Sequence, residues 1–155
     1  LVTPAPTFDH QEAVAGLWLM LHEYLRATPL GHAVMSPADI ELDARTLVQP
    51  DVFVVPLVEG RRPRRWEDVT GLLLAVEVLS PRTARADRTV KRKRFQREGV
   101  PEYWIVDVFA RLVERWRPGD ERPEVLSEEL TWRPDPALPR LVLDLPKYFA
   151  QVLVE

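Results

Sequence analysis

The chain contains no cysteine, and this absence excludes several kinds of protein at once. Without thiols there is no disulfide framework, no zinc ribbon and no cysteine nucleophile. Glycine is also scarce, at 6 residues, and the sequence has neither a Walker loop nor a G-x-G-x-x-G motif. Ser36 and Ser80 lack a G-x-S-x-G context, so we do not expect a serine hydrolase.

Long hydrophobic runs are missing as well. No stretch approaches the roughly 20 apolar residues that a membrane-spanning helix needs. The first six residues do not resemble a basic and then apolar signal peptide. We therefore expect a cytoplasmic protein that has no membrane partner.

The length and the overall composition are those of one globular domain. The 155 residues are 46% hydrophobic and 29% charged, which excludes disorder and collagen-like repeats. A chain of this size buries roughly 68–70% of the surface that its unfolded form exposes, so its core needs no metal or disulfide. We expect a single domain over residues 1–155. Because the first residue is Leu1 rather than methionine, we also expect an upstream segment to be missing.

A net charge of −3 conceals a strong asymmetry along the chain. Residues 61–97 hold 12 of the 21 basic residues and only four acidic ones. A basic cluster of this kind is typical of a surface that binds a polyanion such as nucleic acid. On charge alone, a solvated helix face that nearby acids balance is the more common explanation.

Apolar periodicity and turn residues predict the order of the elements. A one-sided apolar stripe predicts an amphipathic helix over 9–27, and Asp9 with Glu12 resembles a capping box at its start. A second, very basic helix over 83–98 ends at Gly99. The pattern also predicts a three-strand meander over 34–42, 48–57 and 72–79, and two more strands over 103–109 and 112–116. They are followed by a loop-rich stretch over 118–139, an edge strand over 141–145 and a closing helix from Pro146. This order indicates an α/β or α+β fold with a mixed sheet, in which the apolar run 72–79 is covered on both faces.

Two acidic residues stand where the predicted strands are otherwise apolar. Asp51 follows Pro50 at the start of one strand, and Glu77 lies near the end of the most apolar one. A carboxylate among apolar neighbours is costly unless it is paired, hydrogen-bonded or bound to a metal. If the two strands are antiparallel neighbours, both acids lie at one end of the sheet, where hard oxygen ligands suit Mg²⁺ or Mn²⁺. Alternatively, Asp51 only starts a strand or pairs with an arginine, and Glu77 belongs to a buried ion pair.

Asp87 and Lys91 share one face of the basic helix because they are four residues apart. A lysine on that face can stabilise the negative charge that builds on phosphorus in a transition state, or orient the attacking water. A plain salt bridge on the helix surface is the alternative.

Histidines and aromatic residues give weaker signals. His10, His22 and His32 have no metal-binding spacing, so we expect them to face solvent or to cap helices. Tyr103 and Trp104 are adjacent in a predicted strand, where core packing is expected rather than base stacking.

Four motifs stand in a fixed order along the chain. They are QPDVFVV at 49–55, VEVLSP at 76–81, Asp87 followed by Lys91, and GVPEYWIVD at 99–107. Together they closely resemble the Uma family, which is assigned to the PD-(D/E)XK superfamily of restriction-endonuclease-like folds. The resemblance covers most of the chain. It implies a central mixed sheet flanked by helices, and a Mg²⁺-dependent phosphodiesterase site.

The resemblance also assigns roles to particular residues. Asp51 matches the metal-binding aspartate of the superfamily, and Glu77 matches the acidic residue of the (D/E)XK element. Leu79 stands where the superfamily has its lysine, and Lys91 occupies the position on the following helix where this family is expected to carry one. Phe95 replaces a tyrosine of the family.

The leading prediction is a divalent-metal-dependent DNA endonuclease. Asp51 and Glu77 would bind Mg²⁺ or Mn²⁺, and Lys91 would stabilise the transition state. Asp87 would orient Lys91 or add an outer contact. The basic helix and the loop 61–65 would supply phosphate contacts, which position nucleic acid without reading its sequence, and the helix residues are Arg85, Arg88, Arg92 and Lys93.

Other functions remain open at this point. Leu79 in place of the lysine keeps open a catalytically inactive binding or assembly module with the nuclease fold. RNA and branched structures are alternative substrates. By analogy with restriction enzymes that cut one strand per subunit, a homodimer is expected.

Overall fold

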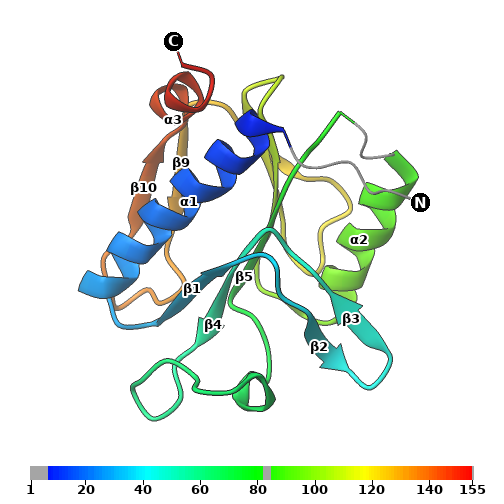
Figure 1. Cartoon of the computed structure of the whole chain (residues 1–155), viewed down its shortest axis with the longest axis vertical. Helices are drawn as coiled ribbons and strands as arrows, with labels where there is room; N and C mark the ends of the chain where they lie inside the picture. Colours follow the sequence, from blue (N-terminus) through cyan, green and yellow to red (C-terminus); the bar gives the residue numbers. More distant parts are fainter. Residues whose placement is uncertain (1–6, 82–84, 155) are drawn as a thin grey trace.

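The computed structural model of the chain, which describes residues 7–81 and 85–154, has a central sheet with helices on both of its sides (Figure 1). The helices are α1 (Phe8–Ala27), α2 (Arg85–Arg97), α3 (Leu145–Val152) and a 3₁₀ turn, η1 (Trp66–Asp68). The strands are β1 (Gly31–Met35), β2 (Ile40–Asp43), β3 (Thr46–Val48), β4 (Val52–Pro56), β5 (Leu74–Val78), β6 (Tyr103–Asp107), β7 (Leu112–Trp116), β8 (Glu124–Leu126), β9 (Glu129–Trp132) and β10 (Leu141–Asp144).

The central sheet is mixed, as the sequence predicts. Its strand order is β1-β4-β5-β6-β7-β8, and only the β5–β6 pair is parallel. Parallel neighbours need a crossover, and α2 provides it between β5 and β6. The expected meander is present as β1, β4 and β5, with a separate β2–β3 hairpin inserted between its first two strands.

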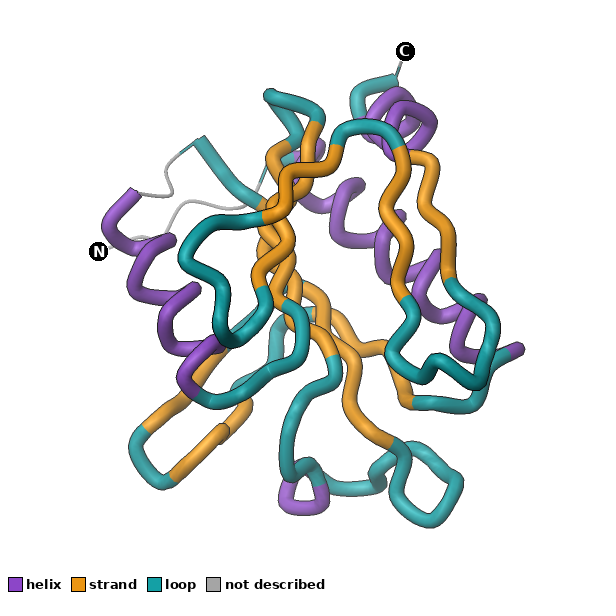
Figure 2. The backbone as a smooth tube through the Cα atoms, turned by 180° about the vertical axis from the view of Figure 1, so that it is seen from behind, coloured by secondary structure: helices purple, strands orange, loops and turns teal. Residues whose placement is uncertain are grey.

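Side chains of β4 and β5 alternate between two buried clusters. Val52 and Val76 pack with α1, α3 and the β9–β10 hairpin on one face. Phe53 and Ala75 pack with α2 and the β2–β3 hairpin on the other. Figure 2 shows α1 and α2 on opposite sides of the sheet. The apolar run in β5 is therefore covered on both faces, which confirms that prediction.

Three details of the elements differ from the sequence prediction. Helix α1 begins one residue early, and its cap is Thr7 rather than Asp9, because the Thr7 hydroxyl accepts a hydrogen bond from the His10 N–H at 3.1 Å. The predicted run 34–42 is two strands, since Pro37 interrupts it. The stretch 118–139 is not only loop, because it contains β8 and β9, which are too short for an apolar period to show.

The strand predicted over 141–145 also has a different partner. It forms β10, which pairs with β9 in a separate two-stranded sheet instead of lying at the edge of the central one. Helix α3 follows directly, with Asp144 as its cap and Pro146 in its first turn, as expected.

Helix α2 ends in a common C-terminal motif and buries few apolar side chains. Gly99 adopts a left-handed φ of 73°, and its N–H donates to the Gln96 carbonyl while the Val100 N–H donates to the Phe95 carbonyl. These two bonds form a Schellman motif. Phe95 is the one buried residue of the described helix, and its ring stacks on Tyr103 at 4.6 Å. The structure confirms a helix here over Arg85–Arg97, while positions 83 and 84 of the predicted span lie outside the described residues.

No helix within residues 7–81 and 85–154 combines the length and the apolar character that crossing a membrane requires.

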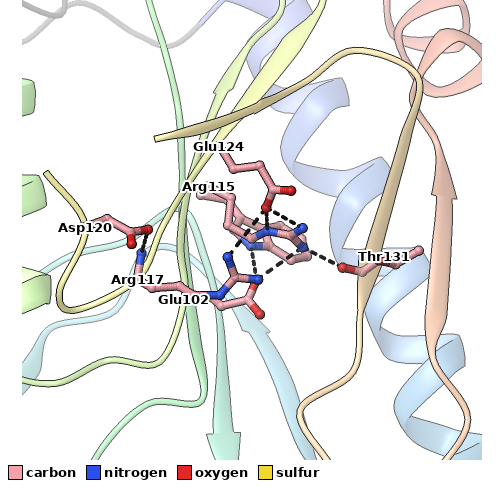
Figure 3. Close-up of polar contacts among 7 residues, drawn as sticks. Glu102, Arg115, Arg117, Asp120, Glu124 and Thr131 are labelled. Atoms are coloured by element: carbon pink, nitrogen blue, oxygen red, sulfur yellow. Dashed lines mark hydrogen bonds and ion pairs between the residues drawn. The ribbon is translucent and has the colours of Figure 1, made fainter. Parts of the chain in front are cut away.

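A buried arginine ties the central sheet to the β9–β10 hairpin (Figure 3). Arg115 of β7 lies 2.7 Å from Glu124 of β8 and 3.5 Å from Glu102, and it donates a hydrogen bond to the Thr131 carbonyl of β9. Only 7% of the Arg115 side chain is exposed. Its charge is therefore removed from water and compensated by two acids and a carbonyl from different elements.

We predict that Arg115→Met destabilises the protein by about 1–3 kcal/mol, because it removes the hydrogen bond to the Thr131 carbonyl and leaves the mostly buried Glu102 without this cation. The free energy of unfolding in urea measures this change. The matched control is Arg117→Met, which removes a half-exposed arginine 3.5 Å from the same Glu124 and should cost less than about 1 kcal/mol. Equal losses in the two variants would contradict the prediction.

Candidate active site

The pairing of β4 with β5 brings the two predicted acids to the same end of the sheet. Val52 pairs with Val76 in antiparallel register, and one further step places Asp51 opposite Glu77. The Asp51 N–H donates to the Val76 carbonyl at 3.0 Å, so Asp51 still belongs to the ladder. The prediction that these strands are antiparallel neighbours with both carboxylates at one end is confirmed.

The Asp51 carboxylate has two partners on its Oδ2 atom. The Val78 N–H donates to this oxygen at 2.8 Å, and His10 Nε2 of α1 lies 3.5 Å from it. The exposed fractions of the His10 and Asp51 side chains are 16% and 18%. The hydrogen bond to the Asp51 carboxylate raises the pKa of His10, with burial opposing the shift and the negative charge of Asp51 adding to it.

Glu77 is a mostly buried acid, and among the described residues its ion-pair partner is Lys91. Lys91 Nζ of α2 lies 3.7 Å from Glu77 Oε2 and 3.6 Å from Asp87 Oδ2. Burial first, and then the negative charge of Asp51, raise the pKa of Glu77 to about 7, although Lys91 opposes the shift. The nearby lysine thus offsets only part of the negative charge that the two acids bring together.

A cleft of about 350 Å³ opens between the β2–β3 hairpin and α2. Glu77 lies in its lining, together with Lys91 and Arg94 of α2 and with Gln49 at the end of the hairpin. The cleft therefore combines one acid with two cations, which is a suitable lining for a phosphate group.

The predicted nucleic-acid contacts on α2 are not beside Glu77. Arg85, Arg88 and Arg92 line a second cavity, of about 270 Å³, against β7. Arg92 is held there, because its guanidinium lies 4.2 Å from the centre of the Trp116 ring. Arg88 Nε is buried and has no hydrogen-bond partner in the described part of the chain. Lys93 is exposed to solvent.

The loop Arg61–Arg65 lies at the opposite end of β4 from the acids. It follows the C-terminal end of β4, whereas Asp51 precedes the N-terminal end of that strand. The five residues of β4 place the two ends about 17 Å apart. The loop is therefore separate from the acidic pair, and its role in phosphate binding stays a prediction.

Two residues of this region were not predicted as site residues. His10 was expected to face solvent or to cap a helix, and that expectation is wrong, since its side chain is partly buried and lies against Asp51. Arg94 was not among the helix residues named as nucleic-acid contacts. Its position three residues after Lys91 was the available signal, because residues three apart share a helix face. No comparable signal existed for His10, whose partner lies 41 positions away.

The donor set fits a hard divalent cation held by few protein ligands. Within residues 7–81 and 85–154 no group of three or more His, Cys, Asp or Glu side chains is placed to hold a metal. Mg²⁺ commonly uses one or two carboxylates and keeps several waters, so Asp51 and Glu77 are sufficient in number. Burial and then the charge of Asp51 disfavour the ionised form of Glu77, and a cation would offset both effects.

A mixed sheet that carries two acids and a lysine at one end is an arrangement typical of nuclease-like folds. The model of the Uma2 family, described as "Putative restriction endonuclease", matches residues 1–146. The chain belongs to this family, and the membership supports a nuclease.

A solved structure gives independent information on the fold. The chain resembles a protein from Anabaena variabilis ATCC 29413 described as "a putative nuclease belonging to DUF820", with a TM-score of 0.73 and 18% sequence identity. The match covers 98% of this chain and 86% of the other. It confirms the predicted fold class, a restriction-endonuclease-like mixed sheet flanked by helices. A search of curated proteins found no match.

The raised pKa of Glu77 makes stability depend on pH in the metal-free protein. The pKa of Glu77 is about 7 in the folded state, against its ordinary value of 4.5. The contribution of this shift to the free energy of unfolding is therefore fully present below pH 4.5 and is lost as pH rises through 7. We predict that between pH 4.5 and pH 8 the parent loses roughly 3 kcal/mol more stability than Glu77→Gln. Urea unfolding at a series of pH values measures this difference.

The control for that experiment is Glu67→Gln, which removes an exposed acid and should keep the pH dependence of the parent. Asp51→Asn should lower the Glu77 pKa, measured by carbon NMR of the side-chain carboxyl, because it removes a neighbouring negative charge. Parallel stability profiles for the parent and Glu77→Gln would refute the assignment.

Proposed function

We propose that the protein is a divalent-metal-dependent endonuclease that hydrolyses phosphodiester bonds of DNA. The observation that carries this proposal is the pair of partly buried acids, Asp51 and Glu77, at one end of the sheet with Lys91 3.7 Å from Glu77. Membership in the Uma2 family supports the same class of activity.

Asp51 and Glu77 are the residues that hold the cation, Mg²⁺ or Mn²⁺. The bound ion supplies Lewis acidity and lowers the pKa of a water molecule. The two carboxylates come from neighbouring strands of a sheet that is buried on both faces, so their separation is fixed by the backbone ladder. Such preorganisation keeps the cost of reorganising the site low.

Lys91 takes the place of the lysine that is missing at position 79. In the cleft it donates to an oxygen of the scissile phosphate and offsets the charge that builds there. Asp87, four residues earlier, lies 3.6 Å from the ammonium group and orients it. Leu79 packs against the apolar cluster beneath α2, so it takes no part in the chemistry. The lysine at 91 favours a catalytic site over an inactive binding module.

DNA is the proposed substrate, and α2 is its principal phosphate contact. Arg94 lines the cleft beside Lys91, and Lys93 faces solvent. Arg85 and Arg88 extend the basic surface along the helix to the second cavity. A homodimer would provide one cleft for each strand of a duplex.

We predict that Glu77→Ala abolishes Mn²⁺-dependent cleavage of plasmid DNA, because it removes a metal ligand. Lys91→Met should lower the cleavage rate by roughly 10²–10³-fold, since one charged donor to the transition state is lost. The measurement is the single-turnover rate at saturating Mn²⁺.

Lys147→Met is the matched control, because it removes an exposed lysine on α3, across the sheet from α2. It should retain cleavage within a fewfold. Cleavage by Glu77→Ala at the rate of the parent would rule out the assignment. DNA binding by the parent without Mn²⁺ binding or cleavage would indicate the binding module instead, and cleavage of RNA alone would change the substrate.

The contacts on α2 predict a specific salt dependence. Arg85→Gln and Lys93→Gln each replace an exposed basic residue of α2. Each variant should reduce the slope of log affinity against log salt by about 0.9, because one phosphate contact is removed. Fluorescence anisotropy with a labelled duplex measures the slope. Lys147→Gln on α3, across the sheet from α2, should leave it unchanged. Equal slopes for all variants would place the duplex on another surface.

A further inference from the structure

His10 is the residue of α1 that reaches the acidic pair. Its Nε2 atom lies 3.5 Å from Asp51 Oδ2, and 16% of its side chain is exposed. Gln11 and Glu12, which follow it, are exposed to solvent. The contact is thus made by the one side chain of the first helical turn that turns toward the sheet.

We propose that His10 is a positioning residue for the metal-binding aspartate of this site. Its role is to hold Asp51 through Oδ2 and to leave Oδ1 as the single oxygen that faces the cation. This inference rests on the proposed function, since it concerns how the same carboxylate binds its metal.

The contacts of Asp51 support this division between its two oxygens. Oδ2 accepts from the Val78 N–H at 2.8 Å and is the atom that faces His10, so both of its contacts fix the same end of the carboxylate. The Val78 N–H belongs to β5, whereas His10 comes from α1 on one face of the sheet. Two donors from different elements define the rotation of the carboxylate better than one.

The start of α1 is built to keep His10 in place. The Thr7 hydroxyl accepts the His10 N–H at 3.1 Å, which ties the first helical turn to its cap. Ala13 and Leu17 then bury the helix against the sheet. The backbone of His10 is therefore fixed by a cap on one side and by core packing on the other, as a positioning role requires.

The role of His10 can be tested by calorimetric titration with Mn²⁺ at one fixed pH. The variants are His10→Leu, which keeps the bulk but has no donor, and His10→Gln, whose amide can donate from a similar reach. We expect His10→Leu to weaken Mn²⁺ binding by roughly 10–100-fold and His10→Gln to recover most of it. In cleavage assays, His10→Leu should raise the Mn²⁺ concentration for half-maximal rate and keep the rate at saturation.

The matched control is His22→Leu, which removes the second histidine of α1 at a site where it stacks on Trp18, 4.6 Å away. It should bind Mn²⁺ like the parent. Unchanged affinity in His10→Leu would overturn this inference alone, as would equal weakening in His10→Leu and His10→Gln. Nitrogen coupling from a directly bound imidazole in pulsed EPR of the Mn²⁺ complex would also overturn it, because His10 would then be a ligand. No Mn²⁺ binding by the parent would overturn the proposed function and this inference together.

Discussion

The register between β4 and β5 is the constraint on which the candidate site depends. Because Val52 pairs with Val76, Asp51 comes opposite Glu77 at the end of the ladder. A slip of one residue would turn Glu77 toward the face where Val76 and Val78 are packed. Both faces of these strands are buried, so the apolar side chains that stabilise the core also fix the separation of the two acids.

Placing two carboxylates close together where little water reaches them makes it unfavourable for both to be ionised. Burial and the charge of Asp51 raise the pKa of Glu77, and Lys91 compensates only in part. His10 lies against Asp51 on the other side. Ionising both acids in the metal-free protein is therefore unfavourable. The proposed divalent cation would offset this cost.

Helix α2 shows how little apolar contact is needed to place a functional side chain. Phe95 stacks on Tyr103, and Gln96 donates to the carbonyls of Arg117 and Asp120 at 2.8 Å each. These contacts set the rotation of the helix, which brings Lys91 to Glu77 and turns Arg92 to Trp116. The same helix thus places Lys91 in one cavity and Arg92 in another. A lysine on the helix can reach this site where the strand carries Leu79, because Lys91 Nζ lies 3.7 Å from Glu77 Oε2.

Local sequence patterns predict the mixed sheet, the long first helix, the basic crossover helix and the two acids as candidate site residues. Local pattern carried this information, since apolar periodicity, the prolines and Gly99 act over a few residues. Which further side chains meet those acids depends on the tertiary structure. His10 reaches Asp51 across 41 positions, and the direction of β4 places the loop Arg61–Arg65 at the opposite end of that strand from Asp51. Such contacts depend on strand order and helix rotation, and no short sequence window records them.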